Sequence, residues 1–187
     1  FNILEATRLY SSEAFFEFSS TNKVYGSMGS VNVIQRNGRY EYENLKEGIS
    51  EDFCIDFHSP YGCSKGAADQ YVRDYSRIYG LRTVVLRQSC IYGTRQFGIE
   101  DQGWVAWFII ASILNKPITI YGDGMQVRDV LWIDDLIDVY IRLYENKDKV
   151  SGEIFNIGGG PANTLSILEL FRYLEEEGIM KQSPAFG

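Results

Sequence analysis

The stretch Ser59-Pro60-Tyr61-Gly62-Cys63-Ser64-Lys65 is followed by an amphipathic run over residues 66–79, and together they indicate the fold most clearly. Ser59 can cap a helix and Pro60 is favoured at the first helical position, so the segment predicts that a helix starts here. Tyr61 and Lys65 would then lie one turn apart on the same face. An ammonium about 4 Å from a phenolate contributes up to roughly 4 kcal/mol at an effective dielectric of ~20, which favours loss of the phenol proton near neutral pH. Tyr61 is therefore a candidate acid/base group.

The Tyr-x-x-x-Lys spacing is weak evidence by itself. The chain has 13 tyrosines among 187 residues, and Tyr42 with Lys46 repeats the spacing. That second pair lies between Gly38 and Gly48, with neither a strand before it nor an apolar face behind it. We interpret it as solvated loop, so the surroundings of Tyr61 must decide its role.

The composition predicts a globular chain of one domain or a little more, with 45% hydrophobic and 14% aromatic residues. A net charge of −7 without a basic run argues against nucleic-acid binding. The longest apolar run, residues 105–114, is shorter than the roughly twenty residues of a membrane-spanning helix, and the first residues show no export signal. Three cysteines without metal-ligand spacing to the single histidine, His58, indicate reduced thiols in a cytoplasm and no metal site.

Apolar periodicity predicts alternating helices and strands, with residues 27–57 as a long loop over the site, residues 158–160 as a turn, and no element after Glu177. Strand 14–18, helix 61–79 and strand 81–87 form a parallel βαβ pattern. The other expected helices are 1–11, 103–114, 133–144 and one capped by Thr164 or Ser166, and the other expected strands are 118–121, 126–131 and 153–157. On helix 61–79 we expect a buried face made of Ala68, Tyr71, Val72, Tyr75, Ile78 and Tyr79.

Polar residues follow the first two of these strands. Ser19, Ser20 and Thr21 end one strand, while Gln88 and Ser89 end the next. The carboxyl ends of parallel strands form the ligand edge of an open α/β sheet. The alternative is that the hydroxyls only satisfy turn amides.

Arg128 follows the turn Gly122-Asp123-Gly124 and precedes an apolar strand. A guanidinium in this place can bind a diphosphate through two hydrogen bonds. It can equally be a structural partner of Asp129 or Asp135, and the sequence leaves both interpretations open.

Five motifs in order resemble the extended short-chain dehydrogenase/reductases that act on nucleotide sugars, the NAD-dependent epimerase/dehydratase family. They are Phe-Ser-Ser-Thr-Asn-Lys-Val-Tyr-Gly at residues 18–26, the Tyr61 stretch at 59–65, Leu-Arg to Tyr-Gly at 86–93, Gly-Asp-Gly-Met-Gln-Val-Arg-Asp at 122–129 and Phe-Asn-Ile-Gly-Gly at 155–159. Each motif is weak alone, but five in order over most of the chain are specific.

The resemblance implies an α/β fold: the C-terminal part of a Rossmann-like doubly wound parallel sheet, with part of a small nucleotide-sugar-binding lobe. The N-terminal half, which carries the glycine-rich turn for the NAD pyrophosphate, is expected to be missing. The chain would then be a single incomplete unit. Rossmann-like elements would occupy about residues 1–93 and 129–160, and substrate-lobe elements about 94–128 and 161–187.

The resemblance also implies roles for particular residues. Tyr61 would be the acid/base, Lys65 would make it more acidic and hold the nicotinamide ribose, and Thr21 would hydrogen-bond the reacting sugar hydroxyl. NAD would be the cofactor, and no metal is required. The implied cofactor-binding residues are Ser19, Ser20, Tyr61, Lys65, Gln88 and Ser89; the implied substrate-binding residues are Thr21, Asn22, Arg95, Gln126 and Arg128.

The implied function is NAD-dependent epimerisation of a nucleotide-linked sugar through a transient keto-sugar. The motifs most resemble family members that act at C2 of a CDP-sugar. The resemblance therefore also implies a cytoplasmic homo-oligomer that serves lipopolysaccharide biosynthesis. The family's 4,6-dehydratases carry Asp-Glu after the catalytic threonine, where this chain has Asn22 and Lys23, so dehydration is disfavoured. The alternatives are a non-catalytic or truncated nucleotide-sugar-binding remnant, or another family reaction such as 4-epimerisation or 4,6-dehydration. Trp132 and Cys90 depart from the usual histidine and asparagine and leave the fine substrate choice open.

Overall fold

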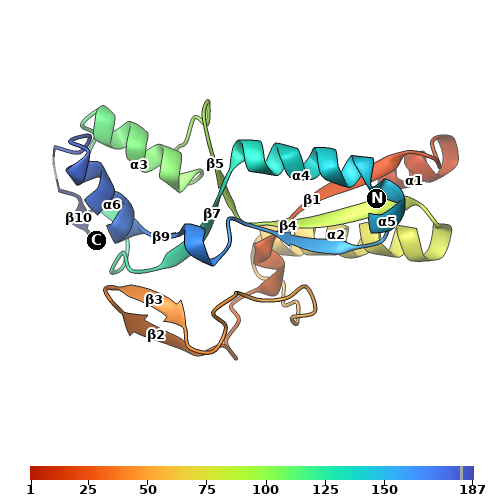
Figure 1. Ribbon diagram of the computed structural model, residues 1–187, viewed down its shortest axis with the longest axis horizontal. Coiled ribbons are helices and arrows are strands. Elements are labelled where there is room, and N and C mark those ends of the chain that lie inside the picture. Colours follow the sequence, from red (N-terminus) through yellow and green to blue (C-terminus); the bar gives the residue numbers. More distant parts are fainter. Residues whose placement is uncertain (182) are drawn as a thin grey trace. The chain divides into compact units, whose positions relative to one another are not determined.

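The computed structural model describes residues 1–181 and 183–187; Gln182, within the predicted tail, lies outside them (Figure 1). The chain divides into two compact units. The first unit comprises Phe1–Ser30, Ile49–Ser89 and Asp134–Ile157, and the second comprises Val31–Gly48, Cys90–Ile133 and Gly158–Gly187. Four segments that we predicted among the Rossmann-like elements group with the second unit: residues 31–48, 90–93, 129–133 and 158–160. The predicted assignment of the two parts to cofactor and substrate stays a prediction.

The first unit is built on a three-stranded parallel sheet in the order β1-β4-β8. Helix α2 connects β1 to β4, which confirms the predicted parallel βαβ unit. The elements are α1 (Asn2–Tyr10), β1 (Phe15–Thr21), the 3₁₀ helix η1 (Asn22–Tyr25), α2 (Ser59–Tyr79), β4 (Arg82–Gln88), α4 (Ile133–Glu145), α5 (Lys147–Val150) and β8 (Ile154–Ile157).

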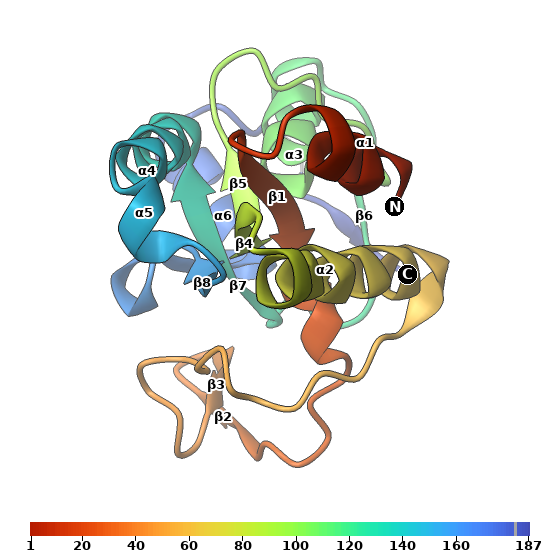
Figure 2. The same cartoon turned by 90° about the vertical axis from the view of Figure 1, so that its right-hand side faces the viewer.

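The two faces of this sheet are covered by different helices (Figure 2). Val85 packs in a core with α1 and α2, whereas Val84 and Leu86 pack in a core with Leu143 of α4. Successive side chains of a strand point to opposite faces, so the odd-numbered residues of β4 face α2 and the even-numbered residues face α4. This alternation decides where the polar residues at the strand's end point.

Helix α2 starts one residue earlier than predicted, with His58 rather than Ser59 as its N-cap and Pro60 as its second residue. Its first residue is Ser59, and the Ser59 hydroxyl accepts a hydrogen bond from the Gly62 amide at 3.1 Å. Gly80 ends the helix in the left-handed conformation, with φ +68°. A Cβ atom on Gly66 would overlap the Phe57 ring, so the close approach of the preceding loop requires glycine at this position.

The predicted buried face of α2 is partly wrong. Val72 and Tyr75 are buried, but Tyr71, Ile78 and Tyr79 are 49%, 65% and 52% exposed. The contact with the sheet is narrow, and glycines and Asp69 supply the rest of the buried face. The three exposed apolar side chains therefore form part of the surface of the first unit.

A buried ion pair joins α2 to the sheet. Asp69 is 0% exposed and Arg87 of β4 is 3% exposed. The guanidinium donates to both carboxylate oxygens, from Nε to Oδ2 at 3.0 Å and from Nη2 to Oδ1 at 3.1 Å. The Ser20 hydroxyl of β1 donates to the same carboxylate at 2.7 Å. One carboxylate thus fixes α2 against the ends of both strands.

The second unit contains a three-stranded sheet in the order β5-β7-β9, with β5 parallel and β9 antiparallel to β7. Helices α3 and α6 and strand β6 pack around a core that includes Phe108, Phe171 and Leu174. The elements of this unit are the hairpin β2 (Val33–Arg36) and β3 (Arg39–Tyr42), β5 (Cys90–Tyr92), α3 (Trp104–Ile113), β6 (Thr119–Ile120), β7 (Val127–Trp132), the 3₁₀ helix η2 (Pro161–Asn163), β9 (Thr164–Ser166), α6 (Ile167–Glu176) and β10 (Ala185–Phe186).

Two predictions for this unit are wrong. The stretch 27–57 is not one long loop, because β2 and β3 pair as an antiparallel hairpin around Asn37 and Gly38. Both turn residues have positive φ, +52° and +76°, as a two-residue hairpin turn requires. The tail is not free of structure either, since β10 pairs with β6 in parallel.

Residues 105–113 of the apolar run lie in α3, where Phe108 and Ala111 belong to the core. Among the helices of the described residues, none combines the length and apolarity needed to cross a lipid bilayer. Ser166, not Thr164, caps α6, in a reciprocal capping box with Glu169.

The α1–α2 contact should weaken at low pH. Hydrogen bonds from the Arg8 guanidinium and the Tyr75 hydroxyl lower the pKa of Glu5 from 4.5 to about 2. Because folding lowers this pKa, the carboxylate stabilises the fold fully above pH 4.5, and this contribution is lost as the pH falls toward about 2. Thermal unfolding should show Glu5→Gln less stable than wild type at neutral pH, with the difference shrinking on acidification. The exposed Glu145→Gln is the control, and a pH-independent difference for Glu5→Gln would show that the charge of this carboxylate does not stabilise the contact.

Removing one member of the buried ion pair should be costly. Arg87→Met leaves the Asp69 carboxylate buried without its counter-charge and should lower the free energy of unfolding by about 3–5 kcal/mol. The double variant Asp69→Leu with Arg87→Met removes both charges and should recover much of that loss. Urea unfolding of the whole protein measures both effects. A loss below about 1 kcal/mol for Arg87→Met would show that the pair does not hold α2.

Candidate active site

The polar residues at the ends of β1 and β4 come together at one edge of the sheet. The parallel register pairs Ser20 with Arg87 and Thr21 with Gln88. The Tyr140 hydroxyl of α4 lies 2.7 Å from the Ser19 hydroxyl and accepts from the Gln88 amide at 2.5 Å. Ser19 and Gln88 thus share a partner on the α4 face.

The Ser20 hydroxyl points to the other face. It is buried and donates to Asp69, as the alternation of the strand demands. Ser89 continues the edge beyond β4, and its amide donates to the Ile157 carbonyl at 2.9 Å. The predicted cofactor-binding residues of β1 and β4 therefore lie at the carboxyl edge of the sheet, with their side chains on both of its faces. Their role toward a cofactor stays a prediction.

Lys65 reaches this edge from α2. Its ammonium donates to the Ser19 carbonyl at 2.8 Å and lies 5.2 Å from the centroid of the Phe18 ring. Tyr61, one turn earlier, is 54% exposed, so its ring is accessible from outside the first unit. The structure therefore brings the Tyr61–Lys65 turn to the carboxyl end of β1.

Thr21 lies at the last position of β1 and is 7% exposed. Its hydroxyl accepts from the Lys23 amide at 3.3 Å and lies 3.5 Å from Asn22 Oδ1. The ideal Cβ position of Gly62 is 3.6 Å from the Lys23 carbonyl oxygen. The first turn of α2 thus lies directly against the segment that follows Thr21.

A buried network that sequence reasoning missed supports this arrangement. Arg87 Nη1 donates to the Tyr25 hydroxyl at 3.0 Å and to the Glu51 carbonyl at 3.1 Å. Tyr25 in turn donates to Asn156 Oδ1 at 2.6 Å. The signal available in the sequence was Asp69, an acid one turn after Lys65 on a helix face that meets a sheet. Its partners are distant in sequence and could not be inferred.

The predicted substrate-binding residues other than Thr21 and Asn22 lie in the second unit. Arg128 of β7 is exposed, and its Nη1 donates to the Val127 carbonyl at 2.9 Å. Gln126 is partly buried next to β7, while Arg95 is exposed in a loop with φ +65°. Asn22 is exposed at the start of η1. The substrate-binding role of these residues stays a prediction.

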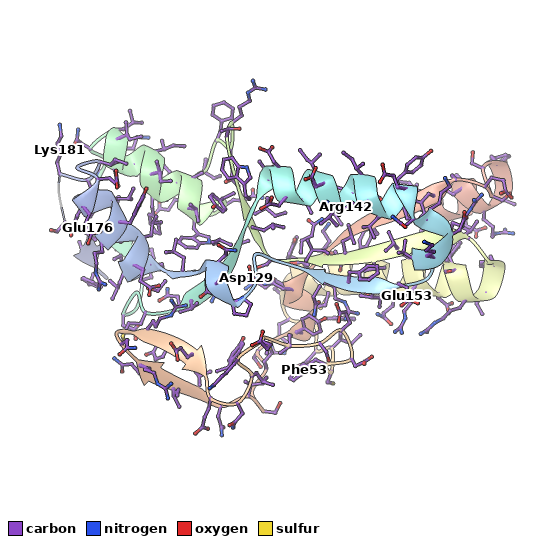
Figure 3. All side chains as sticks on the ribbon, in the orientation of Figure 1. Phe53, Asp129, Arg142, Glu153, Glu176 and Lys181 are labelled. Atoms are coloured by element: carbon purple, nitrogen blue, oxygen red, sulfur yellow. The ribbon has the colours of Figure 1, made fainter. Side chains whose placement is uncertain are left out.

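The glycine run after β8 packs closely on β7. Asp129, labelled in Figure 3, accepts from the Gly159 amide at 2.5 Å. A Cβ on Gly158 would overlap an Asp129 carboxylate oxygen, so no other residue fits there without displacement. Burial raises the pKa of Asp129, although the Gly159 and Gly160 amides oppose this effect. The run forms the expected turn and closes on the strand that carries Arg128.

Comparison with known proteins gives consistent results. The model of the NAD dependent epimerase/dehydratase family matches residues 1–158. A CDP-paratose 2-epimerase of Salmonella typhi is 51% identical over 180 residues, which cover 94% of this chain and 53% of that protein. A UDP-glucose 4-epimerase of Thermotoga maritima, solved with UDP-glucose, superposes with a TM-score of 0.79 at 30% identity, over 99% of this chain and 53% of that one. A dTDP-glucose 4,6-dehydratase of Bacillus anthracis, solved with NAD, gives a TM-score of 0.77 at 26% identity, over 99% of this chain and 52% of that one.

The chain thus spans about half the length of the curated relatives it matches. The predicted fold class is confirmed, since the parallel sheet with helices on both faces resembles the Rossmann-like fold of these enzymes. On the family match and the shared architecture, this chain belongs to the NAD dependent epimerase/dehydratase family.

Proposed function

We propose that the whole protein epimerises a nucleotide-linked sugar with NAD as cofactor, at C2 of a CDP-sugar of the paratose/tyvelose type. The observation that carries the proposal is the Lys65 ammonium on the Ser19 carbonyl, which holds the Tyr61–Lys65 turn at the end of the strand that carries Thr21. The 51% identity to a CDP-paratose 2-epimerase supports the choice of substrate.

The residues at this edge fit the ribose and nicotinamide end of a dinucleotide. An ammonium, the Ser19 hydroxyl and a glutamine amide lie at the ends of two adjacent parallel strands, where α/β sheets place such ligands. We assign Lys65, Ser19, Ser20, Gln88 and Ser89 to this end of NAD, together with Tyr61. When bound, NAD would supply a reversible hydride acceptor for the sugar carbon.

Tyr61 would accept the proton of the reacting sugar hydroxyl and return it when the sugar is reduced again. The Lys65 ammonium would stabilise the phenolate through its positive charge. The Thr21 hydroxyl would hydrogen-bond the same sugar oxygen and fix its orientation. The proton that leaves the sugar is the one that comes back, so this half of the chemistry is balanced without another acid.

The residues after Thr21 favour epimerisation over dehydration. Elimination of water requires an additional acid and base next to the substrate. Asn22 and Lys23 occupy the two positions directly after Thr21, and neither carries a carboxyl group. Asn22 Oδ1 instead lies 3.5 Å from the Thr21 hydroxyl.

We assign the nucleotide diphosphate to Arg128, with Gln126 and Arg95 as further ligands, and keep Asn22 as a substrate-binding residue beside Thr21. The Arg128 guanidinium is exposed and donates from Nη1 to the Val127 carbonyl, and such a group carries several further N–H donors that an anion can accept from. Two parallel N–H donors match the geometry of phosphate oxygens, which supports arginine in this role.

Three finer parts of the proposal concern assembly and location. Exposed apolar side chains on α1 and α2, including Ile3 at 71% and Ile78 at 65%, support a homo-oligomer. The three cysteines are free thiols, which supports a location in the cytoplasm: Cys54, Cys63 and Cys90. A role in lipopolysaccharide biosynthesis rests on the likeness to CDP-sugar epimerases alone.

Tyr61→Phe in the whole protein should lower the epimerisation rate by about a hundredfold or more, because the ring remains and only the proton-transfer group is lost. The measurement is the rate of product formation from CDP-paratose, together with the NAD content of the purified variant, which should be unchanged. Tyr144→Phe removes an exposed phenol on α4 and should behave as wild type. Normal turnover by Tyr61→Phe would refute the acid/base assignment.

Arg128→Ala should raise the KM for the sugar nucleotide and the Kd for CDP by about ten- to a hundredfold, since a charge-assisted phosphate contact is lost. NAD binding should not change. Arg142→Ala, at an exposed arginine of α4 labelled in Figure 3, is the matched control. Wild-type affinity for CDP in Arg128→Ala would remove Arg128 from the diphosphate site.

A further inference from the structure

The hairpin β2–β3 interrupts the stretch between the Thr21 strand and the Tyr61 helix, yet it packs within the second unit. Its contacts there are specific and polar. The Tyr40 hydroxyl donates to Asp123 Oδ2 at 2.6 Å, and the Tyr40 amide donates to the Met125 carbonyl at 3.1 Å. Gln35 Nε2 contacts the Met125 sulfur at 3.2 Å. The hairpin therefore holds the turn that leads into Gln126 and Arg128.

This turn needs external contacts to keep one conformation. Gly122 and Gly124 both have positive φ, +84° and +71°, and glycine restricts the backbone least. Asp123 Oδ1 accepts from the Met125 amide at 3.0 Å, so the Asp123 side chain stabilises the turn from inside. The Tyr40 bond to its other oxygen anchors the same carboxylate to the hairpin. The bond also lowers the pKa of Asp123, which keeps it an acceptor.

The hairpin also contacts β9, the strand that pairs with β7 at Arg128. Arg39 donates from Nη1 to Glu169 Oε1 at 3.0 Å and from Nη2 to the Thr164 hydroxyl at 2.5 Å. In the β7–β9 ladder, Leu165 pairs with Arg128 and Thr164 pairs with Asp129. The guanidinium of Arg39 thus joins the hairpin to β9 and to the first turn of α6.

We propose that the hairpin β2–β3 sets the affinity for a nucleoside diphosphate by fixing residues 123–128, with Tyr40 and Arg39 as positioning residues that act through Gln126 and Arg128. This inference rests on the diphosphate site of the proposed function. Freezing the turn before the ligand arrives removes an entropic cost of binding. The hairpin thereby contributes to affinity for the substrate, while the proton-transfer groups at Tyr61 and Lys65 do not depend on it.

The test is calorimetric titration of CDP into the whole protein, combined with steady-state kinetics. Tyr40→Phe keeps the ring and removes the bond to Asp123, so CDP binding should weaken about fivefold, the KM should rise in parallel and kcat should stay unchanged. Arg39→Gln should have an effect in the same direction. Tyr173→Phe, at an exposed tyrosine of α6 in the same unit, is the matched control.

A double-mutant cycle separates positioning from general destabilisation. If Tyr40 acts through Arg128, adding Tyr40→Phe to Arg128→Ala should weaken CDP binding by less than about twofold further. Asp123→Asn, which retains an acceptor for the phenol, should bind CDP better than Asp123→Ala. NAD binding should be unchanged in all of these variants.

The outcomes distinguish this inference from the function on which it rests. If Arg128→Ala weakens CDP binding but Tyr40→Phe and Arg39→Gln do not, the hairpin has no positioning role and the diphosphate site stands. A positioning role is also excluded if Tyr40→Phe lowers kcat at constant KM, or if its effect adds fully to that of Arg128→Ala. If Arg128→Ala itself binds CDP normally, the diphosphate site is wrong and the hairpin inference falls with it.

Discussion

The buried ion pair between Asp69 and Arg87 is the interaction on which the first unit depends. Two charges at 0% and 3% exposure are costly to desolvate, and the bidentate geometry, with further hydrogen bonds from Ser20 to Asp69 and from Arg87 to Tyr25, offsets that cost. The pair connects the middle of α2 to the ends of β1 and β4. Because Lys65 lies one turn before Asp69 on the same helix, fixing Asp69 also fixes the ammonium at the Ser19 carbonyl.

Successive side chains of β1 and β4 point to opposite faces of the sheet, which explains why neighbouring polar residues have different roles. Ser19 and Gln88 point to α4 and meet at the Tyr140 hydroxyl, whereas Ser20 and Arg87 point to α2 and enter the buried network. Residues adjacent in sequence therefore divide between the accessible edge and the interior. Such a site combines partly exposed residues that can bind a ligand with buried residues that hold them in place.

Much of the first unit could be predicted because its signals are local. These signals are the Ser59–Pro60 helix start, the glycine stop at residue 80 and the β-branched run before Gln88, and each acts over a few residues. The buried network could not be predicted, since Ser20 and Arg87 are 49 and 18 residues from Asp69. The hairpin did carry a local signal, Asn37-Gly38, but its short strands are polar and depend on contacts such as Tyr40 with Asp123. The exposed Ile78 shows the opposite error. Helical periodicity indicates that apolar residues share one face of α2, but it does not show whether another element covers that face.

In the proposed reaction, a sugar carbon is oxidised and reduced again while Tyr61 handles only the hydroxyl proton. Epimerisation of CDP-paratose by the whole protein in D₂O tests this division, with the product examined by mass spectrometry and NMR. We expect conversion with the original hydrogen retained at the epimerised carbon, because the hydride leaves and returns without exchanging with water. Solvent deuterium at that carbon would refute the hydride route, because the inversion would then proceed by removal of a carbon-bound proton.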